Sequence, residues 1–375
     1  MEWKEYQIQD VCRLINGRAY SNDEMLEHGK YKIVRVGNLS GGNSTWFYSD
    51  LELPADKYCH NGDLLFAWAC TFGPHIWKED NTIFHYHIWK IVEDKDVVDR
   101  RFFYYYLKYA TGGFLGALNG SVMVHITKSS MEKMNIRIPQ NLEDQRRIAF
   151  ILSSLDRKIE LNNKINADLE EMAQAIFKNW LSECSDDVTI GELSLNITNY
   201  EKTDAEEVVL INSSDVTEGY FDHHNYSPNK NLKGHFKKRF QKGDILYSQV
   251  RPRNRHWAYC NFDANDYLAS TQLMVIRNNP SLITSILLYQ YIISDNVWKE
   301  FTLKTETRSG TFPQGNYEDL SQIRVPYNSD VEGISNQLET LYAKMFMLEK
   351  ENSRLSTLRD TLLPRLMSGE LEVPE

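Results

Sequence analysis

The stretch from Leu142 to Leu181 constrains the fold of this chain most, because its apolar residues predict one long helix. They recur at alternating steps of four and three residues, which is the pattern of a coiled-coil seam. Two asparagines interrupt the seam near its centre. In chain order the seam positions are Ile148, Leu152, Leu155, Ile159, Asn162, Asn166, Leu169, Ala173, Ile176 and Trp180.

A second copy of this seam lies near the end of the chain, 186 residues further on. Eight of its ten positions are again apolar, so a second long helix is predicted. The chain is therefore expected to be an internal duplication with one long helix in each half. The second seam consists of Ile334, Leu338, Leu341, Met345, Leu348, Asn352, Leu355, Arg359, Leu362 and Leu366.

Two short motifs before the helices also recur. A Gly-Asp-(Leu/Ile)-Leu-(Phe/Tyr) segment begins at Gly62 and again at Gly243, and an Ile-Arg-(Ile/Val)-Pro segment ends at Pro139 and at Pro326. Short alternating segments bounded by turn residues surround them, as in a strand-rich domain. The predicted fold class is α+β, with two similar strand-rich globular domains separated by two long antiparallel helices and related by a pseudo-twofold duplication.

The first globular half illustrates the expected elements. A short aromatic helix is predicted from Phe102 to Tyr109, and the glycines and polar residues of 112–121 are expected to end it. The expected strands cover Tyr31–Val36, Leu64–Ala69, Thr82–Val92 and Met134–Pro139.

The duplication also predicts how the helices pack. If the first helix carries the chain from one globular half to the other, the second must return it, so the two should lie antiparallel. The 33 residues from Ile148 to Trp180 would form a rod of about 50 Å. Asn166 and Asn352 would both lie near its centre, where they either pair and fix the register or remain exposed amides.

Composition bounds the cellular setting. No run of residues is apolar enough to span a membrane, and the charged start does not resemble a signal peptide, so a cytoplasmic protein is expected. The five cysteines are scattered and form no Cys-x-x-Cys pair, which favours reduced structural thiols over disulfides or zinc ligands. The net charge of −10 makes the distribution of charge more informative than its total.

The most basic segment runs from Lys230 to Arg255, with nine basic residues and one acid. It ends in an expected hairpin loop that mixes arginines, amides and an aromatic ring. Arginine can bind guanine through two hydrogen bonds, and asparagine or glutamine can bind adenine in the same way, whereas a solvated basic face is the alternative for the lysine-rich part. The residues expected to contact DNA here are Lys238, Ser248, Gln249, Arg251, Arg253, Asn254, Arg255 and His256.

The equivalent loop of the first half, residues 68–78, is aromatic and nearly uncharged, so the halves are expected to read different DNA sequences. A second loop recurs before the closing strand, at residues 119–125 and 307–314, where small residues would let backbone approach a partner. Either loop could also be only a turn. The DNA-binding candidates in and beside these loops are Trp68, Thr71, Phe72, His75, Ser121, His125, Lys128, Arg308, Thr311 and Gln314.

Two further segments complete a recognisable pattern. Residues 145–159 read Gln-Arg-Arg-Ile-Ala-x-Ile-Leu-x-x-Leu-Asp-x-Lys-Ile, and residues 362–371 read Leu-Leu-Pro-Arg-Leu-Met-Ser-Gly-Glu-Leu. Together with the repeated motifs, they make the chain resemble the specificity subunit of type I restriction-modification enzymes. The resemblance implies domains at 1–140 and 185–328 that each read half of a split, asymmetric double-stranded DNA site, and spacer helices at 141–184 and 329–375 that set the gap.

The resemblance also implies the partners. Two methyltransferase subunits would dock on the helices, restriction subunits could join through them, and S-adenosylmethionine, ATP and Mg²⁺ would bind to the partners. The second helix departs from the pattern at its start, where residues 330–333 differ from residues 143–146, so the two docking surfaces are expected to differ in strength.

The chain itself is expected to be noncatalytic and to bind no cofactor. It lacks the glycine-rich nucleotide motifs, the Asn-Pro-Pro-Tyr type of methyltransferase motif and the Gly-x-Ser-x-Gly motif. His85 and His87 would share one face of a strand, but no third ligand is recognisable, so no metal site is expected. The competing hypotheses are an enzyme that acts alone, which the missing motifs disfavour, and a coiled-coil scaffold without DNA specificity.

Overall fold

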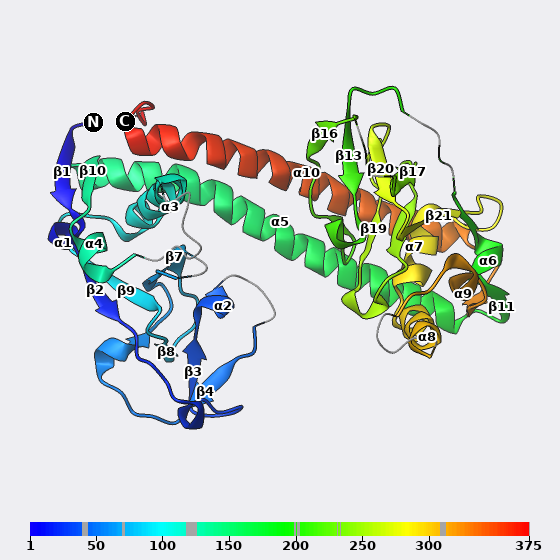
Figure 1. Ribbon diagram of the computed structural model, residues 1–375, viewed down its shortest axis with the longest axis horizontal. Helices are drawn as coiled ribbons and strands as arrows, with labels where there is room; N and C mark the ends of the chain where they lie inside the picture. Colours follow the sequence, from blue (N-terminus) through cyan, green and yellow to red (C-terminus); the bar gives the residue numbers. More distant parts are fainter. Residues whose placement is uncertain are drawn as a thin grey trace. The chain divides into compact units, whose positions relative to one another are not determined.

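The computed structural model describes residues 1–39, 44–69, 72–117, 126–198, 200, 203–230, 232, 234–307 and 313–374, except for the side chains of residues 113–117. The chain forms two compact units (Figure 1). Unit 1 comprises Met1–Leu161 and Asn352–Glu375, and unit 2 comprises Asn162–Glu351. Each unit therefore contains one strand-rich globular part and one portion of each long helix.

In unit 1, the described residues form two four-stranded sheets and one two-stranded ladder. The first sheet has the order β2 (Cys12–Asn16), β9 (Ile88–Glu93), β6 (Leu64–Ala67), β7 (Gly73–Ile76). The second has the order β4 (Phe47–Ser49), β3 (Tyr31–Val34), β8 (Thr82–Phe84), β5 (Tyr58–Cys59). The ladder pairs β1 (Trp3–Gln7) with β10 (Asn135–Pro139). The helices are α1 (Ile8–Val11), α2 (Val36–Leu39), α3 (Arg100–Ala117) and α4 (Lys128–Glu132).

Unit 2 repeats the two sheets and the ladder of unit 1 and adds a second ladder. Its described residues form one sheet ordered β12 (Ser194–Asn196), β21 (Leu273–Asn278), β18 (Ile245–Ser248), β19 (Trp257–Tyr259). Another is ordered β16 (Tyr226–Pro228), β13 (Glu207–Ile211), β20 (Tyr267–Ser270), β17 (Phe236–Lys238). Two ladders pair β11 (Asp186–Thr189) with β22 (Arg324–Tyr327) and β14 (Val216–Thr217) with β15 (Tyr220–Phe221). The helices are α6 (Ile190–Leu193), α7 (Ser285–Ile293), α8 (Asp295–Glu306) and α9 (Tyr317–Ser321).

The predicted α+β duplication is confirmed at the level of strand pairing. One pair in each unit is parallel, β3 with β8 and β13 with β20, and the other described pairs of these sheets are antiparallel. The equivalent strands occupy equivalent positions in both sheets. A coincidence of strand order and direction across two sheets indicates that the halves share one fold.

The two long helices are α5 (Leu142–Ser182) and α10 (Glu332–Ser368). Within each unit they run antiparallel, as predicted, because residue numbers rise along one helix as they fall along the other (Figure 1). Hydrogen bonds join residue 147 to 374 and 156 to 359 in unit 1, and residues 162 to 351, 166 to 345 and 170 to 342 in unit 2.

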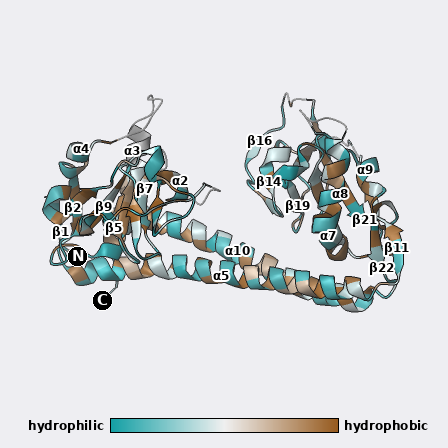
Figure 2. Cartoon of the chain, turned by 90° about the horizontal axis from the view of Figure 1, so that it is seen from below, coloured by the Kyte–Doolittle hydropathy of each residue, from teal (hydrophilic) through white to brown (hydrophobic). Residues whose placement is uncertain are grey.

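The predicted seam is also confirmed, since each of its positions on both helices is buried or half-buried. Polar and apolar residues alternate along the two helices accordingly (Figure 2). The polar seam residues have specific partners: Arg359 donates to Asp156, and Asn166 donates through Nδ2 to the backbone carbonyl of Met345 at 3.4 Å. The pairing of Asn166 with Asn352 stays a prediction.

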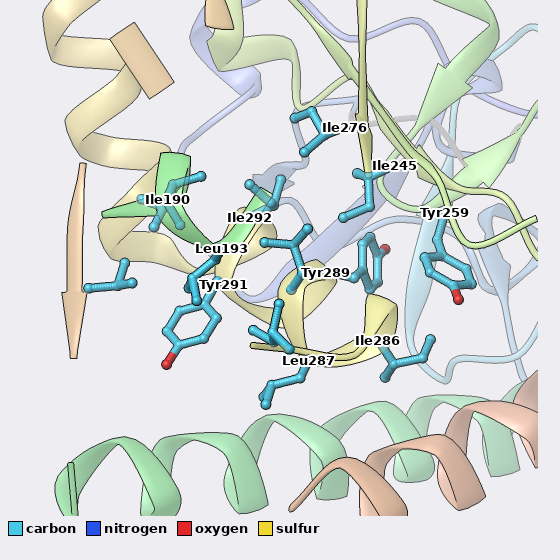
Figure 3. Packing of buried hydrophobic residues seen from close by; sticks show 14 of the residues in the cluster. Ile190, Leu193, Ile245, Tyr259, Ile276, Ile286, Leu287, Tyr289, Tyr291 and Ile292 are labelled. Atoms are coloured by element: carbon cyan, nitrogen blue, oxygen red, sulfur yellow. The ribbon is translucent and has the colours of Figure 1, made fainter. Parts of the chain in front are cut away.

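Each globular part shares one hydrophobic core with its portions of the helices. In unit 2, Ala173 of α5 and Leu338 of α10 join a cluster that extends through α7 to strands β18 and β21. Figure 3 shows this layer, with Leu287 and Ile286 directed toward the helices. In unit 1, Leu152 of α5 contributes to the equivalent cluster. Burial of these side chains fixes the helix pair to the sheets in each unit.

The repeated Gly-Asp motif has the same structural task in both units. Gly62 and Gly243 have φ values of 89° and 92°, a left-handed conformation that glycine adopts without a steric penalty. The aspartates that follow, Asp63 and Asp244, each accept a hydrogen bond from the backbone N–H three residues earlier, at 2.9 and 2.8 Å. The motif is therefore a tight turn that leads into the central strands β6 and β18.

The same aspartates also pair with a cation on the neighbouring strand. Arg277 of β21 donates to the fully buried Asp244 through Nε and Nη2, at 2.7 and 2.8 Å. In unit 1, Lys90 of β9 lies 2.7 Å from Asp63. The ion pair is thus duplicated along with the strands that carry it.

Substitution Asp244→Ala is expected to destabilise unit 2 by about 3–5 kcal/mol, because it leaves the Arg277 guanidinium without its buried carboxylate. Chemical denaturation of the purified chain, followed by far-ultraviolet circular dichroism, measures this change. The matched control Asp263→Ala removes an exposed carboxylate and is expected to change stability by less than about 0.5 kcal/mol. Equal effects of the two substitutions would contradict the assignment.

The predicted end of the aromatic helix is wrong. Helix α3 does not stop before Gly112 but continues to Ala117. Its buried face, which includes Phe102, Phe103 and Leu107, packs into the core of unit 1. A glycine inside a helix costs about 0.5–1 kcal/mol relative to alanine, which is less than the gain from burying one such aromatic side chain.

The described cysteines, Cys12, Cys59, Cys184 and Cys260, are free thiols. Burial raises the pKa of Cys12 and Cys260 to about 12, so these two remain protonated at neutral pH and act as small apolar side chains. In the part of the chain that the structure describes, no helix has the length and apolar character needed to cross a membrane.

Candidate nucleic-acid interface

The arginine-rich segment of unit 2 is the hairpin loop between β18 and β19, as predicted. A single 3₁₀ turn, Pro252–Asn254, forms its tip. The flanking residues Arg251 and Arg255 have φ values of 48° and 53°, a left-handed conformation that is rare for residues other than glycine. Strained backbone of this kind persists only where the surroundings hold it, and it often occurs at ligand-binding sites.

Helix α8 holds the tip in place. The indole Nε1 of Trp298 donates to the carbonyl of Pro252 at 2.9 Å, and the same ring packs 4.5 Å from the guanidinium carbon of Arg255. At the end of the helix, Glu306 accepts a hydrogen bond of 2.8 Å from Nη2 of Arg253. The Arg253 side chain remains 71% exposed, so it is oriented by Glu306 and still accessible to a partner.

The second predicted loop of unit 2 lies beside the first. The backbone N–H of Arg251 donates to the carbonyl of Pro313 at 3.0 Å, and Gly315 donates to the carbonyl of Gln249 at 2.9 Å. Gln314 and Asn254 are both exposed. The structure therefore brings arginine and amide side chains from two loops onto one surface. Arg308 and Thr311 lie outside the described residues.

Other candidates of the hairpin shape the loop instead of presenting a free group. Ser248 is buried and exchanges hydrogen bonds with the backbone of Val250. His256 lies with Nδ1 2.7 Å from the carbonyl oxygen of Val216. These contacts tie the base of the hairpin to the rest of unit 2.

Lys238 is a poor fit to the expected DNA contact. It is 5% exposed, and its ammonium donates to the carbonyls of Thr271 and Leu273 at 3.3 and 2.6 Å. Burial lowers its pKa accordingly. Because side chains alternate along β17, Lys238 points inward while Lys237 is exposed. The structure therefore makes Lys237, and not Lys238, the accessible lysine of this strand.

The corresponding loop of unit 1 connects β6 to β7 and is aromatic, as its sequence predicts. Phe72 packs edge-on against Phe66 at 5.2 Å, and Trp68 stacks on Trp89 at 5.9 Å. Half-buried His75 lies on β7, where burial lowers its pKa. Lys128 begins α4 and lies 3.5 Å from Glu132. Thr71, Ser121 and His125 lie outside the described residues.

The residues His85, Tyr86 and His87 were expected on one strand. In the structure His85 forms an isolated parallel bridge with Arg18, and Tyr86 and His87 form the turn between β8 and β9. The structure places this turn beside Trp68, whose indole donates to the carbonyl of Tyr86 at 2.9 Å. Burial lowers the pKa of His85 to about 4, so its ring is neutral at pH 7. Within the described ranges, no group of three or more His, Cys, Asp or Glu side chains is arranged to hold a metal ion.

The aromatic cluster of Trp68, His85, Tyr86 and His87 was missed as a candidate surface because Trp68 lies at least 17 residues before the other three in sequence. They meet because β6 pairs with β9 so that Ala67 lies opposite Ile88. Tyr86 is 41% exposed. Exposed aromatic rings next to neutral imidazoles offer stacking surfaces and hydrogen-bonding groups, whereas the loop of unit 2 offers guanidinium groups.

A second surface of unit 1 is a groove of about 1050 Å³ along the first turns of α5. It is lined in part by Arg146, Phe150 and Arg157 of α5 and by Tyr104 of α3. Phe150 is 70% exposed, which is unusual for a large apolar side chain and is typical of a protein contact.

The chain is similar to known proteins in sequence and in fold. Residues 1–171 match the family described as type I restriction modification DNA specificity domain. A 177-residue region is 32% identical to the type I restriction enzyme HindI specificity subunit of Haemophilus influenzae and covers 46% of this chain and 39% of that protein. A 179-residue region is 24% identical to the EcoBI specificity subunit of Escherichia coli and covers 36% of it. The chain thus matches less than half the length of these two relatives.

Two other similarities extend further along the chain. The MjaIX specificity subunit of Methanocaldococcus jannaschii is 24% identical over 313 residues, which cover 75% of this chain and 71% of that protein. The crystal structure of a type I restriction-modification S subunit from M. genitalium superposes with a TM-score of 0.62. That alignment covers 97% of this chain and 96% of the other at 17% sequence identity, so it shows a common fold.

Proposed function

We propose that this chain recognises a bipartite double-stranded DNA site. The premise is that it resembles type I specificity subunits and that its residues 1–171 match their DNA specificity domain. Each unit would read one half of the site. The chain would be noncatalytic. It would direct methyltransferase subunits, and through them restriction subunits, to this DNA site. S-adenosylmethionine, ATP and Mg²⁺ would bind to these partner subunits.

One observation carries this proposal: the two units share their strand order but present different side chains from equivalent loops. Unit 2 offers Arg251, Arg253 and Asn254 between β18 and β19. Unit 1 offers Trp68 between β6 and β7, together with the neighbouring Tyr86. Sequence readout depends on which donors, acceptors and apolar groups enter a groove, so equivalent folds with different loops would read an asymmetric site.

The test is to reconstitute the chain with its methyltransferase subunit and to map the methylated adenines by sequencing a genome that was incubated with the complex. We expect two short specific sequences separated by a gap of fixed length and unspecified sequence. Methylation without such a gap, or a purified complex that binds all DNA sequences equally, would contradict bipartite recognition and favour a scaffold without DNA specificity.

We further propose that the groove beside α5 in unit 1 docks a methyltransferase subunit. Phe150 would enter an apolar pocket of the partner, and Arg146 and Arg157 would form the polar rim. The start of α10 differs in sequence from the start of α5, and it would form a second docking surface of different strength.

Substitution Phe150→Ala is therefore expected to weaken binding of the methyltransferase at least tenfold, because a large aromatic anchor at the centre of an interface contributes much of its affinity. Surface plasmon resonance with immobilised methyltransferase measures the change. Leu161→Ala is the matched control, since Leu161 is 51% exposed on the same helix but lies outside the groove. Equal affinities of the wild-type chain and Phe150→Ala would place the partner elsewhere.

A further inference from the structure

A short turn of unit 2 that no sequence motif marks lies directly beside the arginine-rich loop between β18 and β19. It consists of Thr271 and Gln272 and connects β20 to β21, so it leads from one four-stranded sheet of the unit to the other. Both residues are exposed. The function proposed above gives this turn no role.

Three segments of unit 2 meet at the backbone of Gln249, the first residue of the arginine-rich loop. Its N–H donates to the carbonyl of Gln272 at 2.9 Å, and its carbonyl accepts a hydrogen bond of 2.9 Å from the N–H of Gly315. Gly315 follows Gln314, the exposed amide of the second loop. The turn therefore borders the surface on which these two loops present their arginine and amide side chains.

The same contact occurs in unit 1. There the backbone N–H of Trp68 donates to the carbonyl of His87 at 3.1 Å. These two residues are the counterparts of Gln249 and Gln272, because in each unit the loop residue directly follows, and the turn residue directly precedes, the last pair of two equivalent strands. The duplication thus preserves the backbone contact between loop and turn.

The side chains of the turn are not preserved with its backbone. The turn carries Tyr86 and His87 in unit 1, and Thr271 and Gln272 in unit 2. Since different side chains occupy the same two positions of one fold, the fold requires the backbone of the turn and leaves its side chains free to differ. Exposed side chains that differ between two equivalent reading surfaces are expected to carry different base preferences.

The Gln272 side chain is both exposed and oriented. The hydroxyl of Ser213, at the start of the 3₁₀ turn Ser213–Asp215 that follows β13, donates to its Oε1 at 3.3 Å. An amide oxygen can accept a second hydrogen bond, and the Nε2 group donates to no acceptor among the described residues. The side chain thus presents an acceptor and a donor next to each other.

We propose that Gln272 is a specificity-determining residue of unit 2 that reads an adenine in the major groove. Its Oε1 would accept from the N6 amino group and its Nε2 would donate to N7, the two-hydrogen-bond pairing of an amide side chain with adenine. Ser213 would be a positioning residue, since its hydroxyl orients the amide before DNA binds. This inference rests on the proposed DNA recognition and assigns one base position to a segment outside both loops.

A purely supporting role of the turn would be carried by its backbone. The contact to Gln249 uses the carbonyl of Gln272, and the N–H of Thr271 donates to the carbonyl of His235 at 2.8 Å. Neither contact involves a side chain, so replacement of the Gln272 side chain leaves both in place. Substitutions at this position therefore test base reading separately from support of the loop.

The test is an equilibrium competition for DNA by the complex of the full chain with its methyltransferase subunit, followed by fluorescence anisotropy. The competitors carry each of the four base pairs at each position of the half-site that unit 2 reads. Gln272→Ala should lower the preference for adenine about 5- to 150-fold at one position and leave the other half-site unchanged. Ser213→Ala should give a smaller loss at the same position.

Gln272→Glu changes the recognised chemistry instead of removing it. A carboxylate accepts from N4 of cytosine but cannot donate to N7 of adenine, so the preference at this position should shift from adenine toward cytosine. A residue that only supports the fold would not produce this shift. Gln241→Ala is the matched control, since Gln241 is an exposed glutamine that precedes β18, at the end of the strand away from the arginine-rich loop.

Failure of this inference is distinguishable from failure of the proposed function. A wild-type complex without sequence preference would overturn the proposed function and this inference with it. If the wild-type complex is specific, unchanged preferences at every position in Gln272→Ala would overturn the inference alone. Equal weakening of all sequences, or a loss confined to a position without an A·T base pair, would also overturn it.

Discussion

Insertion of one heptad into each long helix, after Leu161 in α5 and after Glu351 in α10, is expected to widen the gap of the methylated site by up to about three base pairs. Seven helical residues add about 10 Å, and each base pair adds about 3.4 Å. Asn162 contacts Glu351, so the two insertions lie opposite each other in the antiparallel pair. Seven residues also preserve the seam.

The half-sites themselves should not change, because neither insertion alters the sheets or loops of a unit. Each added base pair also rotates one half-site by about 34° relative to the other, so we expect slower methylation of the widened site. Genome-wide sequencing of methylated adenines in cells that carry the variant complex measures both properties.

A heptad inserted into α5 alone is the control. It lengthens one helix without its partner, so the contacts between the helices in one of the two units, Asp156 with Arg359 or Asn162 with Glu351, are lost and methylation should fail. An unchanged gap with both insertions in place would contradict the proposal that the helices set the spacing, and altered half-sites would contradict independent reading by the two units.

The elements that sequence predicts well are those specified by local repetition. The α5 helix was predicted from Leu142 to Leu181 and ends at Ser182, because its seam repeats over five heptads without a glycine or proline. The Gly-Asp turn was found by comparing the halves, and its physical role follows from the positive φ of its glycine. Repetition within one chain thus compensates for the weakness of local signals.

What sequence could not provide depends on contacts between distant segments. The pairing of β6 with β9 places Trp68 beside Tyr86, and no periodicity in either segment indicates this. The backbone contact between Arg251 and Pro313 likewise joins two loops 62 residues apart. Lys238 is the opposite case. Alternation of side chains along its strand could be predicted from sequence, but β17 has only three residues, so the sequence does not show which of its two lysines points inward.

Substitution Arg253→Ala is expected to relax recognition of one half-site and to leave the other unchanged. Loss of a two-hydrogen-bond contact to guanine would lower discrimination at one position by about 5- to 150-fold. If the guanidinium instead contacts a phosphate, affinity should fall for all sequences and the salt dependence should weaken by about one counterion. Methylation rates of oligonucleotides with single changes in each half-site, measured at several salt concentrations, separate the two outcomes.

Arg253 is a better test of base recognition than the neighbouring arginines because Glu306 orients its side chain. Glu306 fixes the Nε and Nη2 side of Arg253, so the direction in which the side chain extends from the tip is set before DNA binds. Arg253→Lys keeps the charge but loses the planar fork, so it should abolish discrimination if the contact is to a base and should have little effect if it is to a phosphate.

Glu306→Gln tests the orientation separately. The variant keeps Arg253 but weakens the ion pair, so discrimination should fall while attraction to DNA at low salt rises, because one negative charge near the loop is lost. Lys299→Ala is the control, since Lys299 is an exposed cation on the same helix that does not contact the loop. A loss of discrimination in Lys299→Ala equal to that in Arg253→Ala would mean that general charge attracts DNA here, and the reading of bases would then have to be assigned to the other loop residues, beginning with Asn254 and Gln314.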